Sequence, residues 1–376
     1  MLRLVATISV FFCELLLLAA QTTAADAGSV TWENDFRPIY PEAAVYPRAA
    51  VLSDGRVLVA FAHPTPLGRA IACVVSSDGG KSWAGYQRIC EHPKPVDLDN
   101  AFPLQLADGT VLVAYRRHNR RNHEFRIEVS SSKDGDRWAL RSTVATGTVG
   151  IWEPFLLALP DGSVQVYYAS EEGCYPDQRI EVRTSVDDGI SWGKPVTVAQ
   201  KNGSRDGMPG VVRLNDLELL AVFEAQDVPP FRFVIRGVRS HDLGETWSAT
   251  RQLIYRPDHP VVAPWSAGAP TIIRLPDGRL MVSFQSDEKK AFVAADRRRD
   301  PAHPQYNYLW HTHFACVTSL DQGKSWVAPV HLLGGPDDPA HWNALQVLNE
   351  GTVLALTSHR GRIWVKAGAT DGEPKP

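Results

Sequence analysis

The chain has 376 residues, of which 44% are hydrophobic and 22% are charged, so it is long and apolar enough to bury a core. Its formal net charge of −3 argues against nucleic acid or an anionic membrane as a partner. A local basic run, Arg116–Arg121, goes against this balance, and we interpret most of it as a solvated loop.

The first 25 residues are typical of an export signal. Arg3 supplies the positive charge, an apolar stretch runs from Ile8 to Ala20, and Thr23-Ala24-Ala25 offers small residues for cleavage. No later segment is long and apolar enough to span a bilayer. We therefore expect a secreted or periplasmic monomer whose single domain covers residues 26–376.

Four cysteines follow the signal segment, at Cys73, Cys90, Cys174 and Cys316. None of them has C-x-x-C spacing, so the sequence predicts no zinc site, and we expect no metal or other cofactor. Four cysteines allow one or two disulfides, but their spacing does not identify the pairs.

A hairpin pattern recurs six times along the chain. Each copy has two short apolar strands joined by a turn of the Asp-Gly type, as in P-R-A-A-V-L-S-D-G-R-V-L-V-A-F. The copies begin at Pro47, Pro103, Pro154, Pro209, Pro270 and Ala344, 51 to 74 residues apart. Strand repeats of that period are typical of propeller blades, so six copies predict an all-β, six-bladed β-propeller.

A second pattern, S-x-D-x-G-x-S/T-W, follows five of the hairpins. It occupies residues 76–83, 185–192, 240–247 and 319–326, with a shortened copy at 132–138. Its Ser and Asp side chains bond their own turn, its Gly takes a positive φ, and its Trp folds back as an apolar anchor. We interpret it as the Asp-box between the third and fourth strands of a blade. The sixth hairpin has none, so we expect Val30–Trp32 to supply the missing outer strand and close the ring.

The alignment of the six hairpins predicts which side chains face the central opening. The residues just before the inner strands are aligned as Tyr46, Phe102, Glu153, Met208, Ala269 and Asn343. The residues that end the second strands, eight positions after the turn acid, are Ala62, Arg116, Ala169, Glu224, Gln285 and Ser358. Each class holds one carboxylate, and the two come from neighbouring blades, the third and the fourth.

Paired carboxylates are what glycoside hydrolysis needs, one as the acid and one as nucleophile or base. Glu153 stands in the apolar segment G-I-W-E-P-F, which should raise its pKa and suit it to the acid role. The alternative is that each glutamate pairs with an arginine and merely pins adjacent blades. Burying two carboxylates without neutralising them is costly, which favours a functional pair.

These motifs resemble the sialidase superfamily and, within it, the exo-α-1,5-L-arabinanases of glycoside hydrolase family 93. Apart from the Asp-boxes, the resemblance rests on W-E-P-F at 152–155, G-M-P-G-V at 207–211 leading to A-V-F-E at 221–224, and G-A-P at 268–270 leading to V-S-F-Q-S-D-E at 282–288. It covers nearly the whole chain after the signal segment. It implies an exo-acting, retaining hydrolase of terminal α-linked L-arabinose, with Glu153 as acid/base and Glu224 as nucleophile. It also implies a tyrosine near the nucleophile, for which Tyr306 and Tyr308 are candidates.

The expected partner is an oligo- or polysaccharide held around the mouth of the ring. Aromatic rings that could stack on sugars are Phe102, Trp152, Trp265 and Trp342. The full set of expected substrate-binding residues is Arg48, Asn100, Phe102, Arg116, Trp152, Gln285, Asp287, Tyr308 and Asn343. The insertion from Ala291 to Pro304 is expected to form a rim loop that affects specificity.

An exo-α-sialidase is the nearest alternative function. Such enzymes hold a carboxylate sugar with three arginines, and the candidates are Arg48 and Arg116 with Arg183 or Arg232. The F-R-I-P motif of sialidases is replaced by Y-P-R-A in the first blade, and the related F-R-P-I precedes the first hairpin.

Two further alternatives use the same scaffold. A non-catalytic carbohydrate-binding propeller would need aromatic platforms but no matched carboxylates. A uronate-directed lyase would use a tyrosine or histidine base, for which the histidine candidates are His118, His311, His313 and His341.

Overall fold

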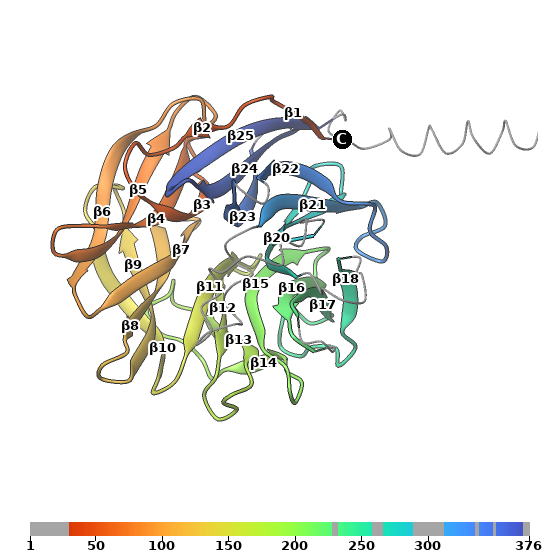
Figure 1. Ribbon diagram of the computed structural model, residues 1–376. Helices are drawn as coiled ribbons and strands as arrows, with labels where there is room; N and C mark the ends of the chain where they lie inside the picture. The colour runs from red at the N-terminus through yellow and green to blue at the C-terminus, as the bar shows by residue number, and fades with distance from the viewer. Residues whose placement is uncertain are drawn as a thin grey trace, which may run out of the picture.

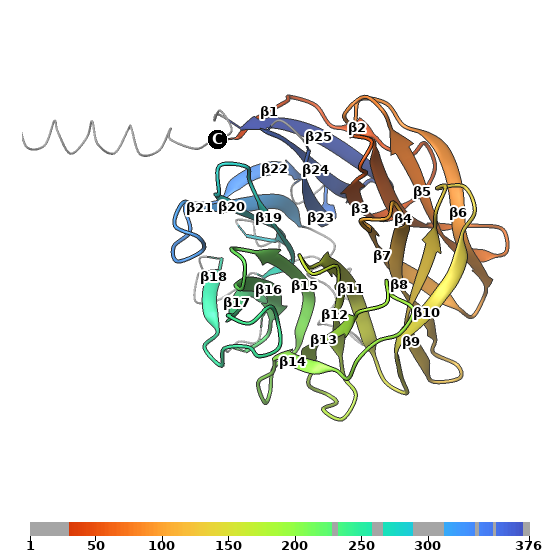
Figure 2. The same ribbon diagram turned by 180° about the vertical axis from the view of Figure 1, so that it is seen from behind.

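The computed structural model describes residues 30–227, 232–257, 266–288, 312–334, 338–348 and 351–370. Within these ranges the strands form six antiparallel sheets arranged around a central axis, so the chain is a six-bladed β-propeller, as the repeats predict (Figure 1). The view from behind shows the same closed ring (Figure 2). The expected signal segment and the Ala291–Pro304 insertion lie outside the described residues.

The first three blades are four-stranded sheets. Blade 1 contains β3 (Val45–Val51), β4 (Val57–Pro64), β5 (Gly68–Ser76) and β6 (Ala84–Pro93). Blade 2 contains β7 (Asp97–Gln105), β8 (Val111–Asn119), β9 (Glu124–Ser132) and β10 (Ala139–Gly147). Blade 3 contains β11 (Ile151–Ala158), β12 (Val164–Ser170), β13 (Arg179–Ser185) and β14 (Val196–Ala199).

Blades 4 and 5 repeat this plan, and blade 6 departs from it. Blade 4 contains β15 (Asp206–Arg213), β16 (Leu219–Ala225), β17 (Val234–Ser240) and β18 (Gln252–Tyr255). Blade 5 contains β19 (Ala267–Arg274), β20 (Leu280–Ser286), β21 (His313–Ser319) and β22 (Val330–Gly334). Blade 6 takes β23 (Ala340–Val347), β24 (Thr352–His359) and β25 (Arg362–Thr370) from the far end of the chain.

The N-terminal strands complete blade 6. β1 (Val30–Trp32) pairs antiparallel with β25, and β2 (Arg37–Pro38) pairs with the same strand. Figure 1 shows these red strands beside the blue strand β25. The predicted closure of the ring by Val30–Trp32 is therefore confirmed. Gly368 permits the contact, because a Cβ there would lie within 2.6 Å of atoms of Val30 and Trp32.

The core lies between neighbouring blades rather than inside each sheet. Between blades 1 and 2, for example, Ala60 and Ile71 pack against Leu98 and Val113 in one buried cluster. The second strands of the blades are covered on both faces, so their sequences read as nearly continuous apolar runs. All seven residues of β12, for example, are buried.

The Asp-boxes form the predicted turns. In the first box, Ser76 Oγ donates to Asp78 Oδ1 at 2.7 Å, Gly80 N donates to Ser76 Oγ at 2.8 Å, and Gly80 has a φ of 88°. The five box tryptophans each pack against a different core cluster, and they are Trp83, Trp138, Trp192, Trp247 and Trp326.

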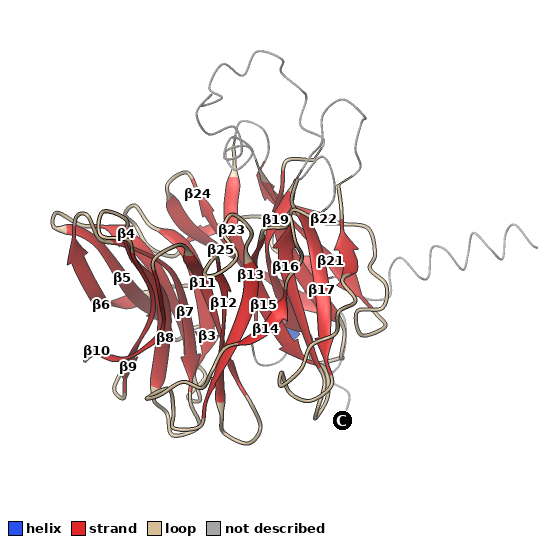
Figure 3. Ribbon diagram, turned by 90° about the horizontal axis from the view of Figure 1, so that it is seen from below, coloured by secondary structure: helices blue, strands red, loops and turns tan. Residues whose placement is uncertain are grey.

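All five Asp-boxes lie at the end of the ring that carries the hairpin turns. Seen from the edge, the strands run between this face and the opposite one (Figure 3). Each box follows the third strand of its blade and sits beside the hairpin of the preceding blade. The first box shows this, because a Cβ on Gly80 would touch Leu354 of β24 at 3.2 Å. The boxes therefore lie at the end of the ring opposite the mouth.

Each inner strand begins with a β-bulge at the mouth of the ring. One residue in each bulge has a left-handed backbone, with φ between 49° and 62°: Tyr46, Asn100, Glu153, Met208, Ala269 and Trp342. Each of them lies eight positions before the turn acid of its hairpin.

This register corrects the sequence alignment in two blades. Phe102 and Asn343 were expected at the mouth position, but the bulge residues there are Asn100 and Trp342. The alignment counted from Pro103 and Ala344, whereas the antiparallel pairing counts from the hairpin turn.

The described cysteines are all free thiols, at Cys73, Cys90, Cys174 and Cys316. The described structure therefore contains no disulfide. Among the same residues, no helix has the length and apolarity needed to cross a membrane.

Candidate active site

Two glutamates from neighbouring blades meet at the mouth. Glu153 lies in the bulge at the start of β11, and Glu224 lies next to last in β16. The point where a side chain on Gly207 would begin lies 3.3 Å from Oε1 of Glu224 and 3.6 Å from Oε2 of Glu153. These two oxygens are therefore no farther apart than the sum of the two distances, about 6.9 Å. The structure thus brings the two predicted carboxylates together.

Two glycines make room for this arrangement. Gly207 pairs with Glu224 across β15 and β16, and a Cβ on it would lie 3.3 Å from Glu224 Oε1 and 3.6 Å from Glu153 Oε2. A Cβ on Gly268, at the start of β19, would come within 2.6 Å of Glu224 Oε2. The glycines of the G-M-P-G-V and G-A-P motifs have no side chain, and this leaves the space that the two glutamates occupy.

Each carboxylate accepts a backbone hydrogen bond from the bulge of the next blade. Met208 N donates to Glu153 Oε2 at 3.3 Å, and Ala269 N donates to Glu224 Oε2 at 2.6 Å. Burial nevertheless raises the pKa of Glu153 to about 7 and that of Glu224 to about 8, and the charge of Glu153 adds to the rise at Glu224. The pair therefore holds a proton near neutral pH.

The carboxylate of Glu224 is more than the fold requires. In the next two blades the same backbone donor is satisfied by neutral side chains, because Trp342 N donates to Gln285 Oε1 and Tyr46 N donates to Ser358 Oγ, both at 2.9 Å. A neutral acceptor would therefore serve the bulge at Ala269 equally well. The ionisable group costs desolvation that the fold does not need, which points to chemistry.

Arg116 is held near Glu153 by a polar network at the mouth of blade 2. Its guanidinium lies 2.9 Å from Asp97 Oδ2 and 3.1 Å from His118 Nδ1. His118 Nε2 lies 2.5 Å from the carbonyl oxygen of Ile151, which can only accept, so Nε2 donates and Nδ1 accepts from Arg116. Burial lowers the pKa of His118 to about 3, which keeps the ring neutral.

A second group of polar residues near the pair was not foreseen from the sequence. Arg205, in the loop before β15, donates to Glu171 Oε1 at 2.5 Å and to Gln178 Oε1 at 2.9 Å. Glu171 also accepts from Trp152 Nε1 at 3.1 Å. These residues come from loops outside the repeated hairpins, so no repeat register could have identified them.

The floor of the mouth is apolar. The bulge residues Tyr46, Met208 and Ala269 pack together on the axis, with Trp342 against them. Burial raises the pKa of Tyr46 to about 12, so its phenol keeps its proton. Arg48 lies over the Tyr46 ring at 3.9 Å and donates to the carbonyl oxygen of Trp342 at 2.8 Å. Arg48 is buried, so it is part of this floor rather than a free sugar-binding group.

The other predicted substrate-binding residues divide into two groups. Asn100, Trp152 and Arg116 lie at the mouth, as expected. Gln285 and Asp287 also lie there, and each accepts a backbone hydrogen bond: Gln285 Oε1 from Trp342 N and Asp287 Oδ1 from Ser266 N. Phe102 and Asn343 lie in the wall between blades: Phe102 packs on Phe155 at 4.4 Å, and Asn343 is fully buried and bonded to Phe284 and Thr357. These two expectations are wrong, because both residues follow the bulge. Tyr306, Tyr308 and Trp265 lie outside the described residues.

The arginines considered for a sialidase triad do not all point into the mouth. Arg48 is buried against Tyr46, and Arg116 is paired with Asp97. Arg183 points away from the mouth, because it donates to the carbonyl oxygen of Gly193, beside an Asp-box. Arg232 lies just before β17.

The histidines give no clear base in the described part of the chain. His118 is buried with both nitrogens engaged, His313 stacks on His331 at 4.1 Å, and His341 lies 2.8 Å from Thr312 Oγ1. His311 lies outside the described residues. No group of three or more His, Cys, Asp or Glu side chains in the described ranges is arranged to hold a metal ion.

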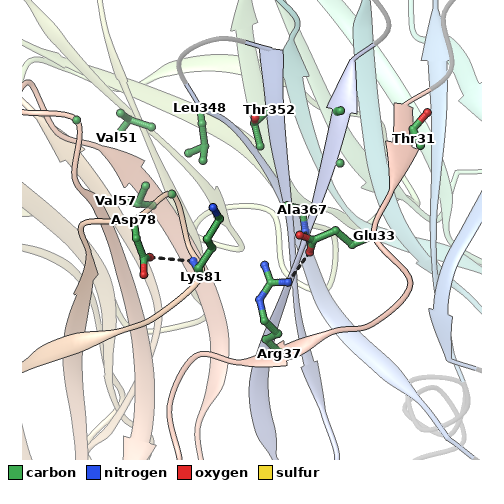
Figure 4. A pocket seen from close by; sticks show the side chains of 14 residues that line it. Thr31, Glu33, Arg37, Val51, Val57, Asp78, Lys81, Leu348, Thr352 and Ala367 are labelled. Carbon is green, nitrogen blue, oxygen red and sulfur yellow. Dashed lines mark hydrogen bonds and ion pairs between the residues drawn. The ribbon is translucent and has the colours of Figure 1, made fainter.

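A separate cleft of about 460 Å³ lies between blades 6 and 1 (Figure 4). Its lining includes Lys81 of the first Asp-box, Gly55 of a hairpin turn, and Glu33 and Arg37 of the N-terminal segment. These residues belong to the Asp-box end of the blades and to the outer strands. The cleft is therefore remote from Glu153 and Glu224, and its size says nothing about their chemistry.

Comparison with known families supports the repeat assignment. The model of the BNR repeat-like domain matches residues 47–227. No curated protein shows significant sequence similarity to the chain. The propeller with Asp-box repeats that the sequence predicts is thus supported both by this family match and by the fold.

Solved structures with the same fold include two groups of glycosidases. An α-L-arabinanase of Penicillium chrysogenum complexed with arabinobiose is 19% identical, with a TM-score of 0.68 over 91% of this chain and 98% of that one. An α-L-arabinofuranosidase of Fusarium graminearum is 21% identical, with a TM-score of 0.68 over 90% and 96%. The NanB sialidase of Streptococcus pneumoniae is 12% identical, with a TM-score of 0.61 over 89% and 70%.

Proposed function

We propose that the protein is an exo-acting glycoside hydrolase that releases terminal α-linked L-arabinose from α-1,5-arabinan. The observation that carries the proposal is the pair of half-buried carboxylates, Glu153 and Glu224, of which Glu224 Oε1 and Glu153 Oε2 are at most about 6.9 Å apart. Retaining glycosidases hold their two carboxyl groups about 5–5.5 Å apart and inverting ones about 6.5–9.5 Å apart, and the bound admits both spacings. Retention is therefore proposed from the resemblance to the family 93 enzymes, and the product's anomeric configuration tests it. The fold shared with two arabinan- or arabinofuranoside-directed enzymes supports the sugar class.

In the first step, a carboxylate oxygen of Glu224 attacks the anomeric carbon and forms a glycosyl ester. The bond from that carbon to the leaving oxygen breaks, and Glu153 gives its proton to that oxygen. The 2.6 Å hydrogen bond from Ala269 N favours ionisation of Glu224 more than the 3.3 Å bond from Met208 N favours that of Glu153. The pKa values have the opposite order, because the charge of Glu153 adds to the rise at Glu224. Since the two carboxyls share one proton, neither comparison assigns the roles, and we propose Glu224 as the nucleophile from the resemblance of W-E-P-F and A-V-F-E to the family 93 motifs.

In the second step, water replaces the enzyme at the anomeric carbon. Glu153, now ionised, takes a proton from the water, whose oxygen attacks the anomeric carbon and releases Glu224 as a carboxylate. Glu153 recovers its proton in this step, so the cycle is balanced without a cofactor.

The test is a comparison of three substrates with the purified protein: aryl α-L-arabinofuranoside, debranched arabinan and sialyl-lactose. We expect turnover of the first two, with arabinose released from chain ends and its anomeric configuration retained. Turnover of sialyl-lactose alone would replace the proposal with a sialidase, the alternative that the NanB fold keeps open. Saturable binding of arabinan without turnover would favour the carbohydrate-binding propeller.

We also propose that the protein acts outside the cytoplasm as a monomer. The support is the signal-like composition of residues 1–25. Fractionation of cells that express the full chain should give a mature form beginning near Asp26, and light scattering should give the mass of one chain. Recovery of an uncleaved cytoplasmic protein would contradict the export proposal.

A further inference from the structure

Arg205 lies between the strand ends that carry the two glutamates. Its backbone carbonyl accepts a hydrogen bond from Gln226 N at 3.1 Å, two residues beyond Glu224. Its guanidinium reaches in the other direction and donates to Glu171 Oε1 at 2.5 Å. One residue is therefore tied to both blades that contribute to the pair.

Glu171 carries this connection to the strand of Glu153. The buried carboxylate accepts from Gly150 N at 3.3 Å and from Trp152 Nε1 at 3.1 Å, so it holds the residues on either side of the start of β11. Gly150 is required here, because a Cβ on it would lie 2.0 Å from Trp152 Nε1 and 2.8 Å from Glu171 Cδ.

Further acceptors fix the plane of the Arg205 guanidinium. Nη1 donates to the carbonyl oxygen of Pro176 at 2.6 Å, and Nη2 donates to Gln178 Oε1 at 2.9 Å. The side-chain nitrogen Nε2 of Gln178 lies 3.6 Å from the position that a Cβ on Gly207 would take. Oxygens of Glu153 and Glu224 lie close to the same position. A planar guanidinium that donates to several acceptors has little conformational freedom. Arginine is commonly used in this way where a site has to be held in one geometry.

The charges that face the pair are few. Arg205 lowers the pKa of both Glu153 and Glu224, whereas Arg116 lowers that of Glu153 and Glu171 raises it. Tyr46 also faces Glu153 and stays protonated. Within the described part of the chain, Arg205 is thus the cation that acts on both glutamates.

We propose that Arg205 is the positioning residue of the glutamate pair, with Glu171 and Gln178 holding its guanidinium where it sets both the spacing of the two strand ends and the shared charge of the two carboxyls. Its meaning for catalysis rests on the proposed hydrolysis, but its effect on the glutamates is measurable without any substrate.

The first test is the pH profile of kcat/KM on an aryl α-L-arabinofuranoside. Arg205→Met removes the positive charge, so both limbs of the bell-shaped profile should move to higher pH by roughly one unit or more. Arg205→Lys keeps the charge and should restore the position of the profile, with a lower kcat because the fork is lost.

Glu171→Gln gives the opposite sign. It removes a negative charge next to Glu153, so the alkaline limb should move to lower pH. If Arg205 and Glu171 only stabilise the loops, neither variant moves the profile, and that outcome would overturn the proposal. The matched control is Arg239→Met, which breaks the 2.9 Å pair with Glu218 in the same blade but at the Asp-box end. It should leave the profile in place.

The second test uses stability and needs no activity. The folded pKa values of Glu153 and Glu224 lie above the unfolded value, so the stability they contribute is full below about pH 4.5 and is lost as pH rises through about 7 to 8. Arg205→Met raises both values further, so its loss in Tm relative to the wild type should be smallest near pH 4.5 and should grow up to about pH 9.

The contribution of Glu171 to this pH dependence must be measured separately, because Glu171 loses its hydrogen-bond partner Arg205 in the Arg205→Met variant. The double variant Glu171→Gln/Arg205→Met has no carboxyl at position 171 and should keep the growing loss relative to Glu171→Gln alone. A loss in Tm that is the same at every pH would mean that Arg205 acts only as a structural link, whether or not the protein hydrolyses arabinan.

Discussion

The two faces of the ring use carboxylates in opposite ways. At the Asp-box face, Asp187 accepts from Ser185 Oγ at 2.7 Å and from Ser191 N and Oγ at 2.9 and 2.6 Å, and these bonds lower its pKa to about 2. At the mouth, Glu153 and Glu224 each accept one backbone N–H, and burial raises their pKa values to about 7 and 8. The first environment stabilises the charge, and the second opposes it.

Repetition separates these two uses. The Asp-box aspartate recurs in five blades, where it closes the same turn each time. Glu153 and Glu224 each occur once, at positions where no other blade carries a carboxylate. A carboxylate that recurs with the repeat therefore serves the fold, and one that breaks the repeat is a candidate for function.

The largest effect is expected from Glu224→Gln. The amide oxygen can still accept from Ala269 N, as Gln285 does from Trp342 N, so the fold should remain intact. Without a nucleophile, kcat on every arabinoside should fall roughly 10⁴-fold or more. Steady-state kinetics on an aryl arabinofuranoside measure kcat, and circular dichroism checks that the fold is intact. Near-normal turnover would place Glu224 with the structural carboxylates.

Glu153→Gln should have a large effect that depends on the leaving group. Loss of general acid catalysis should reduce turnover of arabinan by roughly 10²–10⁴-fold. The first step on an activated aryl glycoside should be spared, because its leaving group does not need the proton. Pre-steady-state kinetics on both substrates test this. Equal losses on both would show that Glu153 is not the acid.

A smaller effect is expected from two glycine variants that differ in how closely they approach Glu224. Gly268→Ala puts a Cβ 2.6 Å from Glu224 Oε2 and must displace the carboxylate, so kcat should fall roughly 10²-fold. Gly207→Ala approaches Glu224 Oε1 only to 3.3 Å and should cost less. Kinetics of the two variants side by side give the ranking, and the reverse order would contradict the geometry of the mouth.

The smallest effect on activity is expected at the Asp-box face. Asp187→Asn should lower Tm at pH 7 and leave kcat unchanged, because the turn is remote from the glutamates. Since the folded pKa of Asp187 is depressed to about 2, its stabilising contribution is present above the unfolded value near pH 4 and is lost as pH falls through about 2. Thermal melts from pH 7 to pH 2 should therefore converge with those of the wild type. A change in kcat would show that the two faces are coupled.

The fold and the glutamate pair were predictable because both follow from the repeat. The Asp-Gly type turns fix the register of each hairpin, and the register fixes which residues reach the mouth. The error at Phe102 and Asn343 has the same origin. Counting eight positions back from the turns at Asp108 and Glu350 gives Asn100 and Trp342, the residues that the bulges present.

The surroundings of the pair could not be predicted in this way. Arg205, Glu171 and Gln178 lie in connecting segments whose lengths differ from blade to blade, and they meet only because the ring brings blades 3 and 4 together. The burial of Arg48 beneath the mouth also depends on long-range packing, since Tyr46 and Trp342 come from opposite ends of the chain.

The pairing of β1 with β25 has a consequence for the order in which the molecule assembles. During synthesis the N-terminal segment emerges first, but its strand partner, Arg362–Thr370, emerges last. Blades 1 to 5 are hairpin arrays that can form locally, whereas the final seam waits for the whole chain. Loop-closure entropy grows only with the logarithm of length, so joining ends about 340 residues apart costs only about 2 kcal/mol more than closing one blade. The seam is thus a late step in time and a modest one in free energy, and it turns an open row of sheets into a ring.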